Sequence, residues 1–479
     1  MSSRGTPFGH ILLWCALGAG ALLRVQLALW DDGIYWPDEL YQSIEPAHRL
    51  VYGYGLVAWE FVAGARTWAM PALVASIMET SRAFGLNEPH GYLLLVRLVF
   101  CAISVLTAWG SYRLARALGA SEFSAAVGAA FFSLAAPVIY FAPKAMSEVA
   151  SALPVTFGLA FVLPRKAPPR SIVLGASLLG VAVLLRLQNG LFCAGLLGIL
   201  AARRDVRALR VAALTLVASA AIYGLLDRLT WGSWFQSAIV YLRFNTVEGG
   251  AASQGTSDVL YYMRTLFRAM PAAAMVFGVL AVSGARRAAG LFALILLFFL
   301  AHTIEPHKEL RFILPILPLW GALAGVGLSE LLSSPRIAIA RAGRGLATIA
   351  LMAVIWSGAA YRTLVFRDLG AHEGFGESAS AFQYSGDINR LLEIAGRLSD
   401  VCGLKIESSR LVWTGGYAYF HNPARLYDSQ KAGRESRFFN YVIDAHNAPG
   451  RLIASDGNTA LLRIADTCEP DPKWTDRLQ

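Results

Sequence analysis

Two adjacent carboxylates, Asp38 and Glu39, follow Pro37 in the segment WPDELYQSIEPAHRLVYGYGLVAW, which covers residues 36–59. Proline fits the first turn of a helix because its missing N–H has no intrahelical partner there, so both acids fall at the positive end of the helix dipole. A carboxylate in this position can take a proton from a hydroxyl group that attacks an activated sugar. Helix capping alone explains the same pair, because acids commonly occupy first helical turns.

A second group of ionisable side chains lies in HTIEPHKELRFILPILPL, residues 302–319, between two apolar segments. Its basic candidates are His307, Lys308 and Arg311. Charges at the edge of a membrane need a partner or a polar ligand, so these three could bind the phosphate of a lipid carrier and stabilise its charge as it leaves. Alternatively, the three basic residues form ion pairs with Glu305 and Glu309. Such ion pairs could coexist with phosphate binding. No metal site is expected, because His302 and His307 lack a close ligand spacing.

Smaller groups of polar residues stand at the ends of other apolar segments. They are Lys144, Ser147 and Glu148, then Arg186, Gln188 and Asn189, and finally the stretch 227–245. Each group could line one cavity at the same membrane face. Snorkelling of a long side chain to the membrane surface explains Arg186 or Arg243 alone nearly as well.

The composition identifies a membrane protein that spans the bilayer several times. The 479 residues are 56% hydrophobic and only 15% charged, and the mean hydropathy is +0.49. The net charge of +10 arises from 42 basic and 32 acidic residues. Much of the basic excess lies in short clusters between apolar runs, which is typical of cytoplasmic loops, so nucleic-acid binding is not expected. The first apolar run, 11–30, is long enough to span and has no convincing cleavage site.

The hydrophobic pattern predicts an all-α bundle of about eleven transmembrane helices. The spans are 10–30, 91–112, 121–142, 147–163, 171–186, 189–202, 208–226, 269–284, 287–303, 312–333 and 345–362. Basic loops recur at every second connection, which places them and the N-terminus in the cytoplasm. The outward connections are then 31–90, 143–146, 187–188, 227–268, 303–311 and everything after 363. The acids, histidines and aromatics gather in these outward loops.

The first outward loop is far longer than a connector needs to be. Its opening helix has an apolar face, Leu40, Ile44, Ala47 and Val51, while Gln42, Glu45, Arg49 and Tyr52 fall elsewhere. The helix is therefore expected to lie on the membrane surface and to end at GYG, residues 53–55. The following segment, 59–85, could give one or two more interfacial helices.

The composition becomes that of an ordinary polar protein from about residue 363. We therefore predict a transmembrane catalytic domain over 1–362 and a small outward α/β domain over 363–479. Its expected elements are a helix over 386–400, strands over 410–414 and 440–444, and a hairpin over 451–465 that turns at Asp456-Gly457-Asn458.

The five cysteines divide into two groups. Cys15, Cys101 and Cys193 lie in apolar runs and are most simply packing residues. Cys402 and Cys468 lie in the polar C-terminal region, where they form a disulfide if the region faces an oxidising compartment and stay free thiols otherwise.

Taken together, these stretches resemble glycosyltransferase family 22, the GT-C mannosyltransferases that use a lipid-phosphate mannose donor to extend GPI anchors and N-glycan precursors. The pattern is most similar to the branch that adds the third mannose of the GPI anchor. The matching segments are PDELYQSIEPAH, YGYG and AWE within 37–60, HKELRFILPILPL (307–319), the stretch from Asp227 to Asn245, and GGYAYFH (415–421).

The resemblance implies an inverting transfer of mannose from a polyprenyl- or dolichyl-phosphate carrier to a lipid-linked glycan. Asp38 would be the general base and Glu39 would support it. The phosphate would be held by His307, Lys308, Arg311 and Arg243. The implied acceptor and cavity residues are Gln42, Glu45, His48, Trp59, Glu60, Glu148, Arg186, Gln188, Asp227 and Asn245. No cofactor is required, because cations already meet the phosphate; a divalent ion held by Asp38 and Glu39 is the alternative.

The chain departs from the family pattern at two places, Arg186-Leu187-Gln188 and Ala145-Met146-Ser147-Glu148. Acceptor identity is therefore the property that the resemblance defines least. The enzyme is expected in a bacterial inner membrane with an outward active site, or in an endoplasmic reticulum membrane with a lumenal one. The rivals are a GT-C enzyme for another sugar or a protein acceptor, and a non-enzymatic transporter. Transporters show matching halves with mid-membrane sites, whereas here the polar groups gather at one face.

Overall fold

The computed structural model of the chain describes residues 7–370, 378–429 and 437–478. The chain divides into two compact units. The helical unit comprises residues up to 27 and 100–379, and the mixed unit comprises 28–99 and 380–479. Two of the three boundaries between them fall inside long helices, α1 (Pro7–Trp30) and α6 (Pro89–Ala117), and the third lies between residues 379 and 380. The first outward loop is thus grouped with the C-terminal region.

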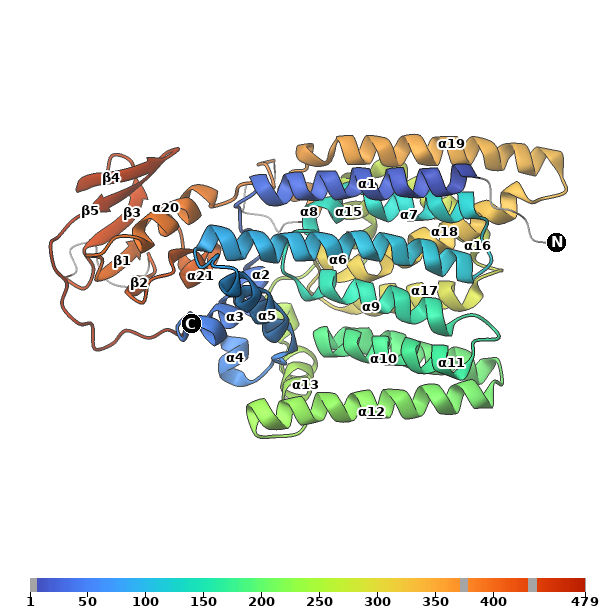
Figure 1. Cartoon of the computed structure of the whole chain (residues 1–479), viewed down its shortest axis with the longest axis horizontal. Coiled ribbons are helices and arrows are strands. Elements are labelled where there is room, and N and C mark those ends of the chain that lie inside the picture. Colours follow the sequence, from blue (N-terminus) through green and yellow to red (C-terminus); the bar gives the residue numbers. More distant parts are fainter. Residues whose placement is uncertain (1–6, 371–377, 430–436, 479) are drawn as a thin grey trace. The chain divides into compact units, whose positions relative to one another are not determined.

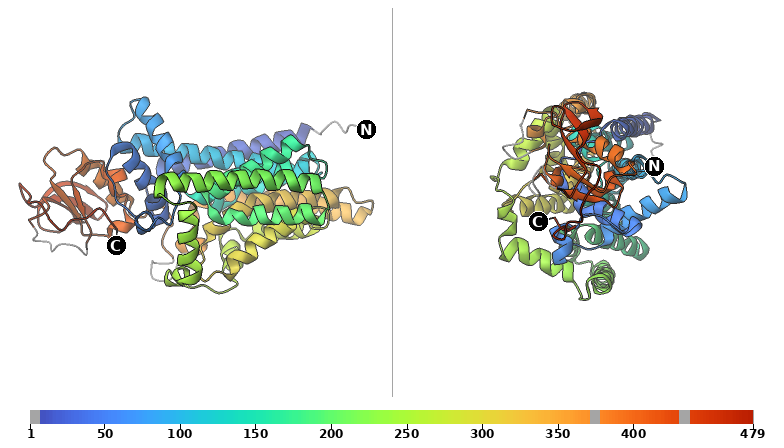
Figure 2. Two further views of the ribbon diagram at one scale, coloured as in Figure 1. Left: turned by 90° about the horizontal axis from the view of Figure 1, so that it is seen from below. Right: turned by 90° about the vertical axis from the view of Figure 1, so that its left-hand side faces the viewer.

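The helical unit consists of apolar helices, most of which run along one another, with α13 crosswise to α12 (Figures 1 and 2). Most of α1 and the second part of α6 belong to this unit. The helices that follow are α7 (Glu122–Leu134), α8 (Ala136–Phe141), α9 (Ser147–Val162), α10 (Pro169–Leu185), η2 (Leu187–Asn189), α11 (Gly190–Ala202) and α12 (Val206–Trp231). Then come α13 (Gln236–Leu242), η3 (Arg243–Val247), α14 (Gly250–Ser253), α15 (Tyr261–Ala269) and α16 (Pro271–Gly284). The last are α17 (Ala289–Ile304), η4 (Leu310–Ile316), α18 (Leu317–Leu332), α19 (Ile337–Ala359), η5 (Tyr361–Thr363) and η6 (Phe366–Leu369).

Glycines allow the closest approaches in this bundle. A Cβ atom on Gly327 of α18 would lie 1.8 Å from the Leu280 carbonyl oxygen of α16, and one on Gly128 of α7 would lie 2.3 Å from the Gly321 carbonyl oxygen of α18. Helices in lipid associate through close packing and hydrogen bonds rather than through the hydrophobic effect, so these small residues fix the contacts of α18.

Each predicted span contains an apolar helix. Five helices in the described part of the chain are long and apolar enough to cross a bilayer, and α15 and α16 would form a sixth span if their 119° bend lies within one crossing. The remaining predicted spans correspond to shorter apolar helices of 10–17 residues. The presence of several membrane-spanning helices is confirmed, and the exact number stays a prediction.

The first outward loop folds into short helices of the mixed unit, as predicted. They are α2 (Pro37–Glu39), the π-helix η1 (Leu40–Ile44), α3 (Glu45–Tyr52), α4 (Trp59–Ala63) and α5 (Ala69–Ala83). Pro37 occupies the first turn, with both acids behind it. Gly53 ends α3 with a left-handed φ of 87°, so the predicted turn at GYG is confirmed.

The full burial of Glu45 does not follow from the helical pattern of the sequence. We expected this side chain off the apolar face, but it is 0% exposed, as is Ala47 on that face. The π-helical turn over 40–44 inserts an extra residue, so the spacing of an α-helix does not carry across it. In addition, α3 packs against both α5 and α21 (Gly416–Phe420), which covers more than one of its faces.

The C-terminal part of the mixed unit is a five-stranded sheet with helix α20 (Gly386–Gly396) beside it (Figure 1). The strands are β1 (Gly403–Ile406), β2 (Arg425–Tyr427), β3 (Tyr441–Ala445), β4 (Arg451–Asp456) and β5 (Thr459–Arg463), in the order β2-β1-β3-β5-β4. The first three are parallel and the β4–β5 hairpin is antiparallel. The predicted helix, the strand over 440–444 and the hairpin are confirmed.

The predicted strand over 410–414 is wrong, because residues 411–413 form a 3₁₀ turn, η7. Side chains take up the backbone groups of Leu411 that a sheet would need. Its N–H donates to Asp428 Oδ2 at 2.8 Å, and its carbonyl accepts from the Tyr41 hydroxyl at 2.7 Å and from the Thr414 hydroxyl at 2.8 Å. Alternating apolar residues alone could not reveal these long-range partners.

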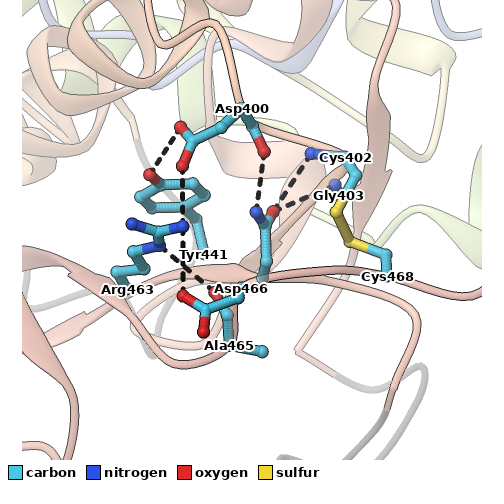
Figure 3. The surroundings of a disulfide bond; sticks show 9 residues. Asp400, Cys402, Gly403, Tyr441, Arg463, Ala465, Asp466 and Cys468 are labelled. Carbon is cyan, nitrogen blue, oxygen red and sulfur yellow. Dashed lines mark hydrogen bonds and ion pairs between the residues drawn. A yellow bond between two sulfur atoms is a disulfide. The ribbon is translucent and has the colours of Figure 1, made fainter.

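A disulfide joins Cys402 to Cys468 (Figure 3). The sequence alone leaves open whether these two cysteines form a disulfide or stay free thiols. The Cα atoms are 5.8 Å apart and the two residues are separated by 66 positions. The side chain of Asn440 accepts from the Cys402 N–H at 3.0 Å and donates to the Asp400 carbonyl at 2.8 Å. Asp400 also accepts from the Tyr441 hydroxyl, so one bond network surrounds the bridge.

Loss of this disulfide is expected to destabilise the mixed unit. The double variant Cys402→Ala, Cys468→Ala frees a loop of 66 residues in the unfolded chain, and should cost about 4 kcal/mol of unfolding free energy. Chemical unfolding of the detergent-solubilised protein measures this loss. The control, Cys15→Ala, removes an exposed free thiol and should change little. An equal stability of both variants would contradict the prediction.

Candidate active site

A buried ion-pair cluster in the helical unit brings together three segments of the chain. Glu148 lies in the first turn of α9, Arg186 follows α10, and Arg311 lies in η4. Glu148 Oε1 is 2.9 Å from Arg186 Nη1 and 3.0 Å from Arg311 Nη1. The side chains of these residues are only 1%, 4% and 4% exposed. Two guanidinium groups therefore share one carboxylate oxygen away from solvent.

Glu309 extends this cluster toward the surface. Its Oε2 is 2.6 Å from Arg311 Nε, and its Oε1 is 2.9 Å from His307 Nε2. Burial alone would raise the pKa of Glu309, but the Arg311 guanidinium and the hydrogen bond from His307 outweigh burial and lower this pKa to about 2. The carboxylate is therefore ionised at neutral pH. The ion pairs expected with Glu309 are present.

Lys308 is held beside the cluster by backbone groups. Its Nζ donates to the Ser257 carbonyl at 2.8 Å and to the Glu305 carbonyl at 2.6 Å. Burial lowers the pKa of Lys308. An ammonium group has three N–H donors, so one remains for a ligand.

The predicted phosphate residue Arg243 pairs with an acid of its own segment. Its Nε is bonded to Glu248 at 2.8 Å, and 72% of its side chain is exposed. Two other predicted cavity residues make local contacts. Asp227 Oδ2 accepts from both the N–H and the hydroxyl of Ser237 at 2.8 Å, which fixes the start of α13. Asn245 donates to the Tyr241 carbonyl at 2.9 Å.

Three further side chains complete this region. Gln188 donates to the Tyr241 hydroxyl. His302 is 6% exposed on α17, and Tyr262 is 0% exposed on α15. Tyr262 is not among the site residues predicted from the sequence. Its only signal was its place at the end of the polar outward stretch 227–268, next to an apolar run.

The two candidate catalytic carboxylates lie in the mixed unit. Glu39 is 6% exposed and Asp38 is half-buried. Gln42 Nε2 donates to Glu60 Oε1 at 2.9 Å. Burial, with a smaller contribution from the charge of Asp38, raises the pKa of Glu60, while Arg66 counters it. Gln42 and Glu60 are thus joined, and the charge of Asp38 acts on Glu60.

Trp59 lies next to Glu60 but faces outward. It begins α4, is 39% exposed, and lines a surface pocket with Val62 and Arg477.

Glu45 and His48 contact protein groups and are both 0% exposed. Glu45 accepts the N–H of Leu56 and that of Ala418, each at 2.7 Å. His48 Nδ1 donates to the Tyr54 carbonyl at 3.0 Å, so its Nε2 accepts from His421 Nδ1 at 3.0 Å. These bonds join the first outward loop to GGYAYFH (415–421). Two motifs that are far apart in the sequence form one cluster here.

The unfolding temperature is expected to fall steeply below about pH 4.5. Burial lowers the pKa of His48 from 6.5 to about 3, so the unfolded chain alone binds this proton and stability falls as pH drops through that window. Burial raises the pKa of Glu45 from 4.5 to about 7, despite the backbone N–H groups, which gives the opposite trend between those values. The two effects offset each other down to pH 4.5, below which the loss through His48 is unopposed.

The variant His48→Asn tests this prediction, because its amide can still donate to the Tyr54 carbonyl but does not titrate. Thermal unfolding of the purified variant should depend less steeply on pH below 4.5 than that of the parent. The same steep decline in the variant would remove His48 as the cause.

Comparison with known families and curated relatives gives a consistent result. The sequence profile of the Alg9-like mannosyltransferase family matches residues 16–373. The chain is 28% identical over 323 residues to GPI mannosyltransferase 3 of Yarrowia lipolytica, which covers 65% of this chain and 61% of that protein. It is 26% identical over 337 residues to mannosyltransferase APTG1 of Arabidopsis thaliana, with coverages of 68% and 60%. The chain thus spans about three fifths of the length of these relatives.

Solved structures show the fold. ArnT from Cupriavidus metallidurans, bound to undecaprenyl phosphate, aligns with a TM-score of 0.64 at 15% identity and covers 97% of this chain and 100% of its own. The oligosaccharyltransferase AglB from Archaeoglobus fulgidus, in complex with an inhibitory peptide and a dolichol-phosphate, aligns with a TM-score of 0.54 at 11% identity, with coverages of 91% and 69%. The predicted GT-C fold and multi-pass membrane architecture are confirmed.

Proposed function

The chain belongs to the Alg9-like mannosyltransferase family, and we propose that it transfers mannose from a polyprenyl- or dolichyl-phosphate carrier to a lipid-linked glycan. Relatives named GPI mannosyltransferase 3 favour a GPI-like glycolipid as the acceptor. The proposed surroundings are membrane lipids, and the proposed product carries a new α-mannosidic bond.

The observation that carries this proposal is the charge of the buried cluster. Its ionised members are Arg186, Lys308, Arg311, Glu148 and Glu309. Three cations against two carboxylates leave one net positive charge, which matches the single negative charge of a phosphodiester. Guanidinium groups bind phosphate oxygens through two parallel N–H bonds, and their field stabilises the second charge that the phosphate gains on leaving. Arg311 and Lys308 are the proposed main contacts, with His307 at the rim.

Asp38 is the proposed general base. It accepts the proton of the acceptor hydroxyl while the hydroxyl oxygen bonds to the anomeric carbon of mannose. The bond from that carbon to the phosphate oxygen breaks, and the phosphate leaves with the electron pair. Attack from the opposite face inverts a β-linked donor to an α-linked product. Glu39, Gln42 and Glu60 would orient the acceptor beside Asp38.

The disulfide supports an outward-facing mixed unit. Disulfides persist in oxidising compartments and are rare in the cytosol. The Cys402–Cys468 bridge thus favours the periplasmic side of a bacterial inner membrane or the lumen of the endoplasmic reticulum.

We expect chelation of divalent ions to leave the transfer rate unchanged, because cationic side chains take the place of a metal at the phosphate. The measurement compares initial rates with and without EDTA. A loss of activity that Mg²⁺ or Mn²⁺ restores would favour the alternative, an ion bound by Asp38 and Glu39.

A donor comparison tests the proposed function. Purified protein in liposomes receives radiolabelled polyprenyl-phosphate mannose, or the glucose or galactose counterpart, together with glycolipids extracted from the source membrane. Label in a new α-mannosyl glycolipid, from the mannose donor only, is expected. Transfer of another sugar would indicate a different GT-C specificity. Movement of the lipid without any new glycosidic bond would indicate a transporter.

A further inference from the structure

Three polar atoms at the edge of the Glu148 cluster have no hydrogen-bond partner among the residues that the structure describes. They are Arg186 Nε, His302 Nε2 and the Tyr262 hydroxyl. All three side chains are more than nine-tenths buried, with exposures of 5%, 6% and 0%. Buried polar groups are normally paired, so a set of unpaired ones at the edge of a candidate site points to a ligand.

These atoms belong to one region of the helical unit. The imidazole of His302 stacks on Phe298 at 4.1 Å, and the ring of Tyr262 lies 5.9 Å from Phe299 of the same helix. The charges of Arg186 and Glu148 act on His302, and those of Arg186, Arg311 and Glu309 act on Tyr262. Tyr262 and His302 thus border the proposed phosphate contacts.

The region also reaches the surface. The side chains of His307 and Glu309 are 16% and 13% exposed, and Glu305 is exposed beside them. This end is therefore the partly exposed side of the cluster.

The donors and acceptors among these three unpaired atoms indicate which chemical group of a ligand they could bind. His302 Nδ1 donates to the Phe298 carbonyl at 2.9 Å, so Nε2 of the neutral ring can only accept. The Tyr262 hydroxyl can donate and accept, and Arg186 Nε can only donate. An ionised phosphodiester offers acceptors alone and cannot satisfy His302. A sugar hydroxyl can donate to His302 Nε2, and it can accept from or donate to the Tyr262 hydroxyl.

We propose that Tyr262 and His302 recognise hydroxyl groups of the donor's hexose, next to the phosphate held by Arg311 and Lys308. The two residues are then specificity determinants for the sugar of the lipid donor. This inference rests on the proposed function. Its test therefore uses binding rather than transfer, so that the two can fail separately.

The variant Tyr262→Phe removes only the unpaired hydroxyl. Its matched control is Tyr261→Phe, because the neighbouring hydroxyl donates to the Gly370 carbonyl at 2.6 Å. Native mass spectrometry in detergent measures the Kd of polyprenyl-phosphate mannose and of polyprenyl phosphate without sugar. Tyr262→Phe should weaken binding of the mannose-bearing lipid about tenfold and leave binding of the bare phosphate unchanged. Tyr261→Phe should affect neither lipid.

Thermal unfolding separates recognition from a structural role. Tyr262→Phe should keep or raise the unfolding temperature, since it removes a buried unpaired group, whereas Tyr261→Phe should lower it. The variant His302→Asn keeps a donor to the Phe298 carbonyl and should repeat the sugar-specific loss. Equal weakening of both lipids by Tyr262→Phe would assign the hydroxyl to the phosphate and overturn the inference. So would unchanged binding of both.

Discussion

Replacement of Asp38 by Asn is expected to lower kcat by about 100- to 10,000-fold, which is the usual contribution of a general base. Asparagine keeps the size and polarity of the side chain but cannot accept the proton of the attacking hydroxyl. The side chain is half-buried in the first turn of α2, so the fold should tolerate the change. Initial rates with saturating donor and acceptor measure the effect, and kcat/KM should fall in the same proportion.

The control for this prediction is Glu79→Gln. Glu79 belongs to the same unit, where it forms a surface ion pair with Arg82 at 2.7 Å with side-chain exposures of 45% and 52%. This variant should keep its full rate, and both variants should unfold near the parent temperature. Near-normal turnover of the Asp38→Asn protein would remove Asp38 from the role of base.

Replacement of Glu148 by Gln is expected to lower the unfolding free energy by about 3–5 kcal/mol, because breaking a buried pair leaves uncompensated charge. Here one carboxylate oxygen serves both Arg186 and Arg311, and all three side chains are at most 4% exposed. Two guanidinium groups would face each other without a carboxylate between them. Chemical unfolding in detergent, followed by tryptophan fluorescence, measures the loss.

The matched control is Glu330→Gln. Glu330 pairs with Arg287 at the surface, with side-chain exposures of 39% and 49%. Exposed pairs contribute less than about 1 kcal/mol. If both variants lost the same small amount, Glu148 would not be the structural centre of the cluster.

The elements that the sequence predicted well are those with a local signal. Apolar segments of sufficient length predicted the helices of the bundle. The Asp456-Gly457-Asn458 turn between two apolar strands predicted the β4–β5 hairpin, and Pro37 predicted the start of α2. In each case neighbouring residues alone determine the backbone.

The features that the sequence did not predict depend on residues far away along the chain. Glu45 is buried because the N–H of Ala418, 373 positions away, bonds to it. The strand expected over 410–414 is replaced by a turn because Tyr41, 370 positions from Leu411, bonds to its carbonyl. A π-helical turn shifts the faces of the first loop by one residue, which an α-helical pattern does not reveal.

In the candidate site, too, features with a local sequence signal were predicted and features that depend on distant partners were missed. The charged motif 302–319 was visible because ionisable residues are rare beside apolar spans. The sequence indicated that the polar groups around Glu148 and Arg186 could line one cavity. It did not reveal that Glu148 pairs with both Arg186 and Arg311 in one cluster, since α9, the residue after α10 and η4 supply one side chain each. Tyr262 gave almost no signal, because a tyrosine next to an apolar run is usually a packing residue.

An experimental structure of the protein in lipid nanodiscs with a non-hydrolysable polyprenyl-phosphate mannose analogue tests the central claim most directly. The account predicts that the phosphate contacts Arg311 and that the Asp38 carboxylate faces the anomeric carbon from the side opposite the phosphate. A phosphate bound away from Arg311, or Asp38 on the other side of the membrane from the sugar, would contradict it.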